Sequence, residues 1–143
     1  MNIKHTLHAL VAAGLLTLAH AASAQVAVIV NPKSPLASMT ADQVSAIFLG
    51  KSATLPSGAT AVPADLPESN AARELFYSKA AGKTSSQVKA TWARLTFSGK
   101  ATPPRELGSA ADVKKLVSSN PDAIGYIEQS AVDSTVKVVL TLD

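Results

Sequence analysis

The stretch DLPESNAARELFYSKAAG, residues 65–82, combines residue types that could hold a small anion. Ser69 and Asn70 precede a run with helical spacing that stops at Gly82, and Arg73 places a cation near its start. Helix N-termini present unpaired backbone N–H groups, which are natural ligands for anions. Two interpretations follow. The stretch either holds an oxyanion, or it begins an ordinary helix that Ser69 or Asn70 caps.

The first 24 residues have the pattern of a secretory signal peptide. Lys4 precedes the apolar run ALVAAGLLTLA, and the small residues ASA follow at positions 22–24. The run is shorter than the roughly 20 apolar residues that a membrane span needs. We therefore predict cleavage after Ala24, export to the periplasm, and no membrane insertion of the mature chain. Residues 25–143 have the length of one domain.

Composition restricts the chemistry of residues 25–143. All three histidines (His5, His8 and His20) fall in the first 24 residues, and the chain has no cysteine. Serine triads, cysteine nucleophiles and His- or Cys-based metal sites are therefore excluded. We predict a protein that is not an enzyme, with no cofactor and no metal. Residues 25–143 hold 12 basic and 10 acidic residues, a net charge of +2 that is too weak to indicate nucleic-acid binding.

Apolar periodicity predicts helices interspersed among strands, the pattern of an α/β layer fold. Strands are expected at 26–31, 59–65, 123–129 and 134–142, helices at 40–50, 70–82, 84–97 and 109–119, and a loop at 98–107. Thr40 and Gln43 have the spacing of a capping box. The predicted core contains Val28, Val44, Ile47, Phe48, Leu75, Phe76, Trp92, Leu95, Val113, Leu116, Ile124 and Ile127.

Three segments, in this order, carry a resemblance to a known family: MTADQVSAIFLGK (39–51), ARELF (72–76) and NPDAIGYIEQSAVDSTVKVV (120–139). They resemble the phosphate-binding proteins that serve ABC importers, within the periplasmic binding-protein superfamily. TWARLTFSGKATPPREL (91–107) is similar to a smaller branch of that group. The resemblance implies one lobe of a two-lobed fold, with a mixed sheet flanked by helices. It also implies a small oxyanion such as phosphate, and as partners a second lobe, a homodimer or a membrane transporter.

In those relatives an arginine and then Ser-Gly-Thr precede the matching helix and hold the oxyanion. Here the three positions fall on Asn70, Ala71 and Ala72, and the arginine position falls on Leu66; a one-residue gap would put Ser69 at the serine position. The arginine and a hydroxyl are therefore missing, while the neighbouring Asp65 and Glu68 add negative charge. We accordingly expect a helix capped by Ser69, with at most weak oxyanion binding.

The resemblance thus gives a ligand-binding set of Ser69, Asn70, Ala71, Arg73 and nearby Ser34, since ligands of α/β folds lie where strand ends meet helix starts. For Arg73 we favour a surface position beside Glu68, Glu74 and Tyr77 over an anion clamp. Two functions remain open: a non-catalytic periplasmic binding-like protein that binds oxyanions weakly, or an accessory interaction module that keeps the fold without a ligand. Lys100 and Arg105, which flank ATPP, either edge a partner-binding surface or lie in a solvated loop.

Overall fold

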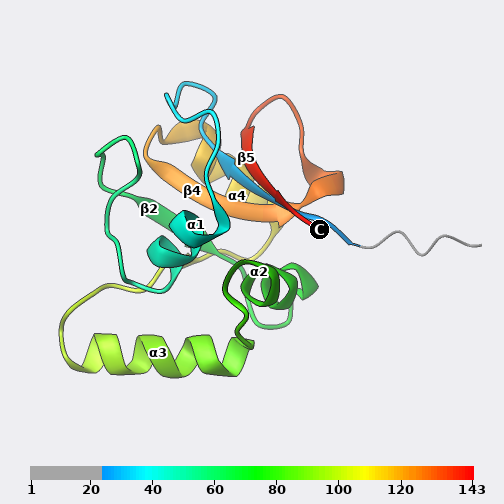
Figure 1. Ribbon diagram of the computed structural model, residues 1–143. Helices are drawn as coiled ribbons and strands as arrows, with labels where there is room; N and C mark the ends of the chain where they lie inside the picture. The colour runs from blue at the N-terminus through cyan, green and yellow to red at the C-terminus, as the bar shows by residue number, and fades with distance from the viewer. Residues whose placement is uncertain (1–23) are drawn as a thin grey trace, which may run out of the picture.

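A computed structural model describes residues 24–143 of the protein, so the predicted signal peptide lies almost entirely outside the described residues. The remaining chain forms alternating strands and helices (Figure 1). In chain order these are β1 (Val26–Val30), α1 (Ala41–Phe48), β2 (Val62–Asp65), α2 (Ala71–Ala81), α3 (Ser85–Phe97), β3 (Arg105–Glu106), α4 (Ala110–Ser119), β4 (Ala123–Glu128), the short 3-10 helix Gln129–Ala131, and β5 (Lys137–Leu142).

The strands form one mixed sheet in the order β3-β2-β4-β1-β5. β2 pairs in parallel with both β3 and β4, whereas β1 pairs antiparallel with both β4 and β5. The interior strand β1 is buried along its whole length, as its continuous apolar sequence predicts for a strand covered on both faces. The predicted α/β fold with a mixed sheet flanked by helices is therefore confirmed.

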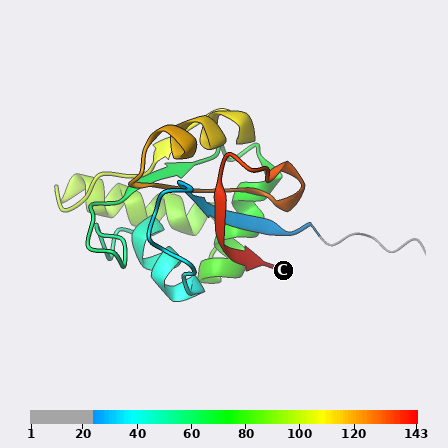
Figure 2. The same cartoon turned by 90° about the horizontal axis from the view of Figure 1, so that it is seen from above.

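Two neighbouring residues of β4 show how the helices divide between the faces of the sheet. A side-chain carbon added at Gly125 would lie 2.6 Å from Val113 Cγ1 of α4. The ring of Tyr126, which points to the opposite face, packs against Phe76 of α2 and Phe48 of α1. Helix α4 thus covers one face, and α1 and α2 cover the other (Figure 2).

Local sequence signals account for most of the helix boundaries. Thr40 and Gln43 form the predicted capping box at the start of α1, with both reciprocal hydrogen bonds present. Gly82 ends α2 in the left-handed conformation, with a φ of 63°. Ser109 caps α4 by accepting a hydrogen bond from the backbone N–H of Asp112.

Most of the predicted core is buried, including Val28, Val44, Ile47, Phe48, Phe76, Val113, Ile124 and Ile127. Leu75, Trp92, Leu95 and Leu116 are only partly buried. Three of these are on helices α2 and α3, and α3 packs on α2 at the outside of the molecule, so part of each helix stays near solvent. The loop predicted at 98–107 is also interrupted, because Arg105–Glu106 adds the short strand β3 beside β2.

Residues 24–143 contain no helix that is long and apolar enough to cross a membrane. The same residues contain no cluster of three or more histidine, cysteine, aspartate or glutamate side chains that could bind a metal ion.

Candidate functional site

Helix α2 begins at the carboxyl end of β2, and its cap is Asn70. Asn70 has an extended backbone, and its Oδ1 accepts the backbone N–H of Ala72 at 3.0 Å. The expectation that Ser69 caps the helix is therefore wrong. The two residues are adjacent and both are good caps, so the hydrogen-bond geometry of the turn decides between them rather than residue type.

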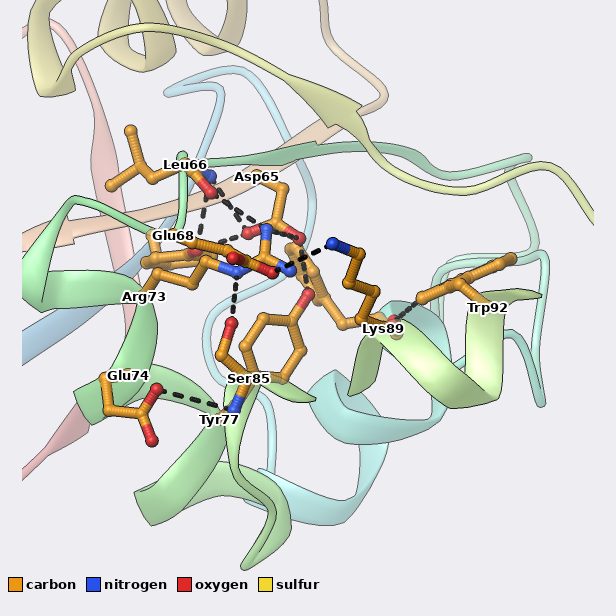
Figure 3. Close-up of polar contacts among 11 residues, drawn as sticks. Asp65, Leu66, Glu68, Arg73, Glu74, Tyr77, Ser85, Lys89 and Trp92 are labelled. Carbon is orange, nitrogen blue, oxygen red and sulfur yellow. Dashed lines mark hydrogen bonds and ion pairs between the residues drawn. The ribbon is translucent and has the colours of Figure 1, made fainter. Parts of the chain in front are cut away.

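Arg73 lies inside the protein and forms an ion pair. Its side chain points back beneath the 65–69 turn, where Nη1 lies 3.3 Å from Asp65 Oδ2 and donates a 2.9 Å hydrogen bond to the carbonyl of Leu66 (Figure 3). Nε donates to Ser85 Oγ at 3.1 Å, which ties α2 to the start of α3. Because Arg73 is only 8% exposed, the expected surface position is wrong. The alternative of an anion clamp stays a prediction, and the guanidinium is paired with Asp65.

Asp65 is the centre of this network, which we call the Asp65 network: Asp65, Arg73, Tyr77, Ser85 and Tyr126. The Tyr77 hydroxyl donates to Asp65 Oδ2 at 2.5 Å, and the Tyr126 hydroxyl donates to Oδ1. The backbone N–H of Leu66 also donates to Oδ1, at 2.9 Å. Both carboxylate oxygens are therefore satisfied, as a buried charge requires.

Burial raises the pKa of both tyrosines well above their usual range, and the negative charge of Asp65 raises each pKa further. Tyr77 and Tyr126 therefore stay protonated and act as hydrogen-bond donors to the carboxylate. The guanidinium carbon of Arg73 also lies 5.4 Å from the centre of the Tyr77 ring, a cation–π distance. Arg73, Tyr77 and Tyr126 thus all stabilise the negative charge of Asp65.

Aromatic rings pack against Tyr77 and Tyr126 and hold them in place. The rings of Phe76 and Tyr126 stack with centroids 4.0 Å apart and planes within 5°. Phe48 meets Phe76 edge-to-face at 4.8 Å, and Phe76 meets Tyr77 in the same way at 4.9 Å. The two edge-to-face contacts have a preferred geometry of aromatic pairs. The hydroxyl groups of the Asp65 network therefore have little freedom to turn toward a ligand.

Ser34 does not join the other predicted site residues. β1 runs antiparallel to β4, while β2 runs parallel to β4, so the carboxyl ends of β1 and β2 lie at opposite ends of the sheet. Ser34 follows the end of β1, is 6% exposed, and accepts the backbone N–H of Leu36. The prediction that Ser34 lies near the Ser69–Arg73 segment is therefore wrong, because the sequence did not reveal the strand directions.

A small hollow of 130 Å³ opens beside the Asp65 network. Its walls are formed by Asp65, Arg73, Lys89, Trp92, Pro103, Pro104 and Glu106. Lys89 stands at its exposed rim, 4.0 Å from Glu68. The cations Arg73 and Lys89 lie here near three acids, which are Asp65, Glu68 and Glu106. The buried Arg73 is already paired with Asp65. The hollow can admit a small polar group, but its charge does not favour an anion.

Sequence reasoning missed Asp65, Tyr77, Ser85 and Tyr126 as members of one network. Asp65 ends a strand, and Arg73 and Tyr77 are four residues apart and so share one face of α2. That spacing, with an acid just before the helix, was the available signal. Ala71 is exposed at the first position of the helix and Ala72 is buried. Both are alanines, so neither has a polar side-chain group for a ligand.

No protein-family model matches the sequence, and no curated protein matches it either. Solved structures do match the fold. A protein of Clostridium perfringens assigned as a phosphate ABC transporter substrate-binding protein, solved with bound phosphate, aligns over 81% of this chain with a TM-score of 0.66 and 22% identity. A phosphate transport receptor of Vibrio cholerae aligns over 81% with a TM-score of 0.64 and 21% identity. PstS of Borrelia burgdorferi also aligns over 81% of this chain, with a TM-score of 0.62 and 13% identity.

These matches show that the chain has the fold of part of a phosphate ABC transporter substrate-binding protein. The aligned region is only 44% of the Clostridium chain, 45% of the Vibrio chain and 46% of the Borrelia chain. The chain therefore spans less than half the length of the proteins it resembles. The predicted resemblance to the periplasmic phosphate-binding group is confirmed at the level of the fold.

Proposed function

We propose that the protein is a non-catalytic, exported lobe of the phosphate-binding kind, which binds small oxyanions such as phosphate only weakly by itself. The fold supports the class of protein. The observation that carries the weak affinity is the pairing of Arg73 with Asp65, because the buried cation nearest the start of α2 is directed toward a carboxylate. A free oxyanion would have to compete with that carboxylate for the guanidinium.

The start of α2 leaves few other donors for an anion. Asn70 already accepts the Ala72 N–H, and positions 71 and 72 are alanines without a hydroxyl group. Glu68 and Glu74, both exposed, add negative charge on either side of the turn. Tight sites usually bury about 70–90% of their ligand, and one lobe covers only one side. A second lobe, from another copy or from a transporter subunit, would supply the missing wall.

Calorimetry of residues 25–143 with phosphate, sulfate and phosphonate tests the proposal. We expect a dissociation constant no tighter than about 1 mM, which corresponds to about −4 kcal/mol. Nuclear magnetic resonance titration should then show phosphate-induced shifts of the amides at the start of α2. The start of α3, capped in a similar way by Thr84, is the internal control for anion binding at any helix N-terminus. A micromolar dissociation constant for any of these anions would overturn the proposal.

The second candidate is an interaction module that has kept the fold and binds no oxyanion. Both carboxylate oxygens of Asp65 accept hydrogen bonds from within the protein, so the network needs no ligand to complete it. This favours the interaction module. The same titration separates the candidates. Saturable shifts at the α2 start support weak binding, whereas identical small shifts at both helix starts support the interaction module.

A further inference from the structure

The charges of the protein are unevenly distributed along the chain. Residues 75–105 contain no acidic residue and six basic ones: Lys79, Lys83, Lys89, Arg94, Lys100 and Arg105. The rest of residues 25–143 contains six basic and ten acidic residues. Although the net charge of residues 25–143 is close to zero, the segment centred on α3 is therefore strongly basic. Clustered charge of one sign attracts partners of the opposite sign and accelerates their encounter.

Helix α3 presents this charge to solvent. It lies along the outside of the molecule, farther from the sheet than α2 (Figure 1), and Val88 is its one fully buried residue. Arg94 is exposed, and one turn later Phe97 ends the helix with 97% of its side chain exposed. Within residues 24–143, neither Arg94 nor Lys100 forms an ion pair. Single exposed apolar side chains are common, so Phe97 alone carries no conclusion.

A cavity of 310 Å³ beside α3 provides the second observation. Its apolar walls come from Ile47, Ala53, Ala61, Pro63, Trp92 and Ala101, and Ser52, Thr60 and Thr102 add hydroxyl groups. Lys100 is the charged residue among those that line it, so its rim is positive. The volume is at the lower end of the range for ligand pockets, about 300–1,000 Å³, and accommodates a large apolar side chain.

A hydrogen bond and close packing hold part of the cavity wall in place. Trp92 Nε1 donates a 2.9 Å hydrogen bond to the carbonyl of Phe48 at the end of α1. Gly50 follows with a φ of 76°, and a side-chain carbon there would lie 2.7 Å from Leu95 and 3.0 Å from Trp92. Glycine thus allows α1 and α3 to approach closely. A wall held in this way needs no reorganisation on binding, which lowers the entropic cost of association.

We propose that Phe97, Lys100 and this cavity form a docking face for an acidic segment of a partner protein that carries an apolar anchor. Charge complementarity selects the acidic partner, since Lys100 lines the cavity, forms no ion pair within residues 24–143 and belongs to the basic segment 75–105. The apolar cavity selects a protein segment with an anchor rather than an anionic membrane surface, which has no side chain to insert. The proposal goes beyond the proposed function and uses different residues from the oxyanion site.

Synthetic peptides test this docking face. The probe is the fluorescein-labelled peptide DEDLFDED, with DEDAADED lacking the anchor and KRKLFKRK reversing the charge. Fluorescence anisotropy of each peptide, measured with the full mature protein, gives the affinity. Trp92 is the only tryptophan of the chain, so a change in its emission reports occupation of the cavity directly. We expect DEDLFDED to bind at least about tenfold more tightly than either control, a difference of about 1.4 kcal/mol.

Three variants locate the binding. Phe97→Ser and Lys100→Glu should each weaken DEDLFDED about tenfold or more, because both residues are exposed and their replacement leaves the fold intact. Lys115→Glu on α4 is the matched control: it makes the same change of charge at an exposed site away from the face, and should weaken binding less than twofold. Far-ultraviolet circular dichroism and melting confirm that each variant is folded.

Two results would overturn the proposal. One is equal binding of all three peptides, or equal weakening by Lys100→Glu and Lys115→Glu, which would show charge attraction without a defined face. The other is Phe97-dependent binding to phosphatidylglycerol vesicles with no binding of DEDLFDED, which would identify a membrane contact. Peptide binding is measured at the cavity and phosphate binding at the start of α2, so failure here and failure of the oxyanion proposal are distinguishable.

Discussion

The guanidinium of Arg73 lies 3.3 Å from the carboxylate of Asp65, and both side chains are more than nine-tenths buried. This ion pair joins the end of β2 to the first turn of α2 and turns the chain sharply between them. It also neutralises the positive charge of Arg73, which would otherwise attract an anion to the start of α2. The same contact therefore stabilises the fold and limits the ligand chemistry.

Removing one member of this pair should destabilise the protein strongly. Asp65→Asn or Arg73→Met leaves a buried charge without its partner, at a cost of about 3–5 kcal/mol. The double variant Asp65→Asn with Arg73→Met should cost clearly less than the sum of the single changes, because the two groups interact directly. Urea melts of the four proteins give the coupling free energy.

Lys114 and Asp133 form the matched exposed pair, 3.0 Å apart. Lys114→Met should cost no more than about 1 kcal/mol, the usual range for surface ion pairs. If Arg73→Met is as mild as Lys114→Met, the buried pair does not stabilise the turn as described.

The two residues before α2 should differ in their effect on stability. Asn70→Ala removes the side chain that caps Ala72 and should lower the free energy of unfolding by about 1 kcal/mol. Ser69→Ala changes an exposed side chain outside the cap and should stay within about 0.5 kcal/mol of the wild type. Thermal or chemical denaturation measures both, and a larger loss for Ser69→Ala would refute the assignment of the cap.

Stability should fall steeply in alkali. Tyr77 and Tyr126 are the only tyrosines, and burial raises the pKa of both above the ordinary value of 10.0. The unfolded chain loses both protons as the pH passes 10, while the folded chain keeps them. This stabilisation is therefore complete below pH 10 and is lost progressively above it.

Tyrosinate absorbance in the ultraviolet, recorded with circular dichroism, checks this prediction. Tyrosinate should appear only together with loss of secondary structure. Tyrosinate formed in a fully folded protein near pH 10 would show that the hydroxyls are open to solvent.

Trp92 should contribute less than a fully buried tryptophan. Its ring is half-buried, so Trp92→Ala should cost less than the 3–5 kcal/mol typical of a fully buried aromatic ring. Trp92→Phe keeps most of the packing and loses the hydrogen bond to Phe48, and should cost about 1 kcal/mol. Denaturant melts followed by circular dichroism compare the two variants with the wild type.

The elements of the fold could be predicted because their signals are local. The capping box of Thr40 and Gln43, the left-handed end of α2 at Gly82 and the continuous apolar run of β1 depend on nearby residues only. The two-residue strand β3 could not be predicted, because Arg105–Glu106 is extended only by pairing with β2, 40 residues earlier. Its sequence carries no apolar alternation.

The position of the site in the chain could be predicted from the sequence, but the contacts of its residues could not. The stretch 65–82 was identified from its helix start, and that start is where the buried network lies. The roles of its residues depended on contacts distant in sequence. Asp65 meets Tyr126 across 61 positions, and Arg73 turns inward because Ser85 of another helix receives its Nε. Ser34 was misplaced because strand direction, which residue types do not encode, separates it from Asp65.

The first residue of β1, Val26, pairs with the last residue of β5, Leu142, and the side chains of Gln25 and Asp143 are joined by a 2.6 Å hydrogen bond. A short glycine-serine linker could therefore connect these two points without disturbing the sheet. New ends could then be opened at the exposed turn around Gly58, where a side-chain carbon would meet no other atom. The protein is thus suited to circular permutation, and a permuted chain could carry a reporter domain at Gly58, remote from the Asp65 network.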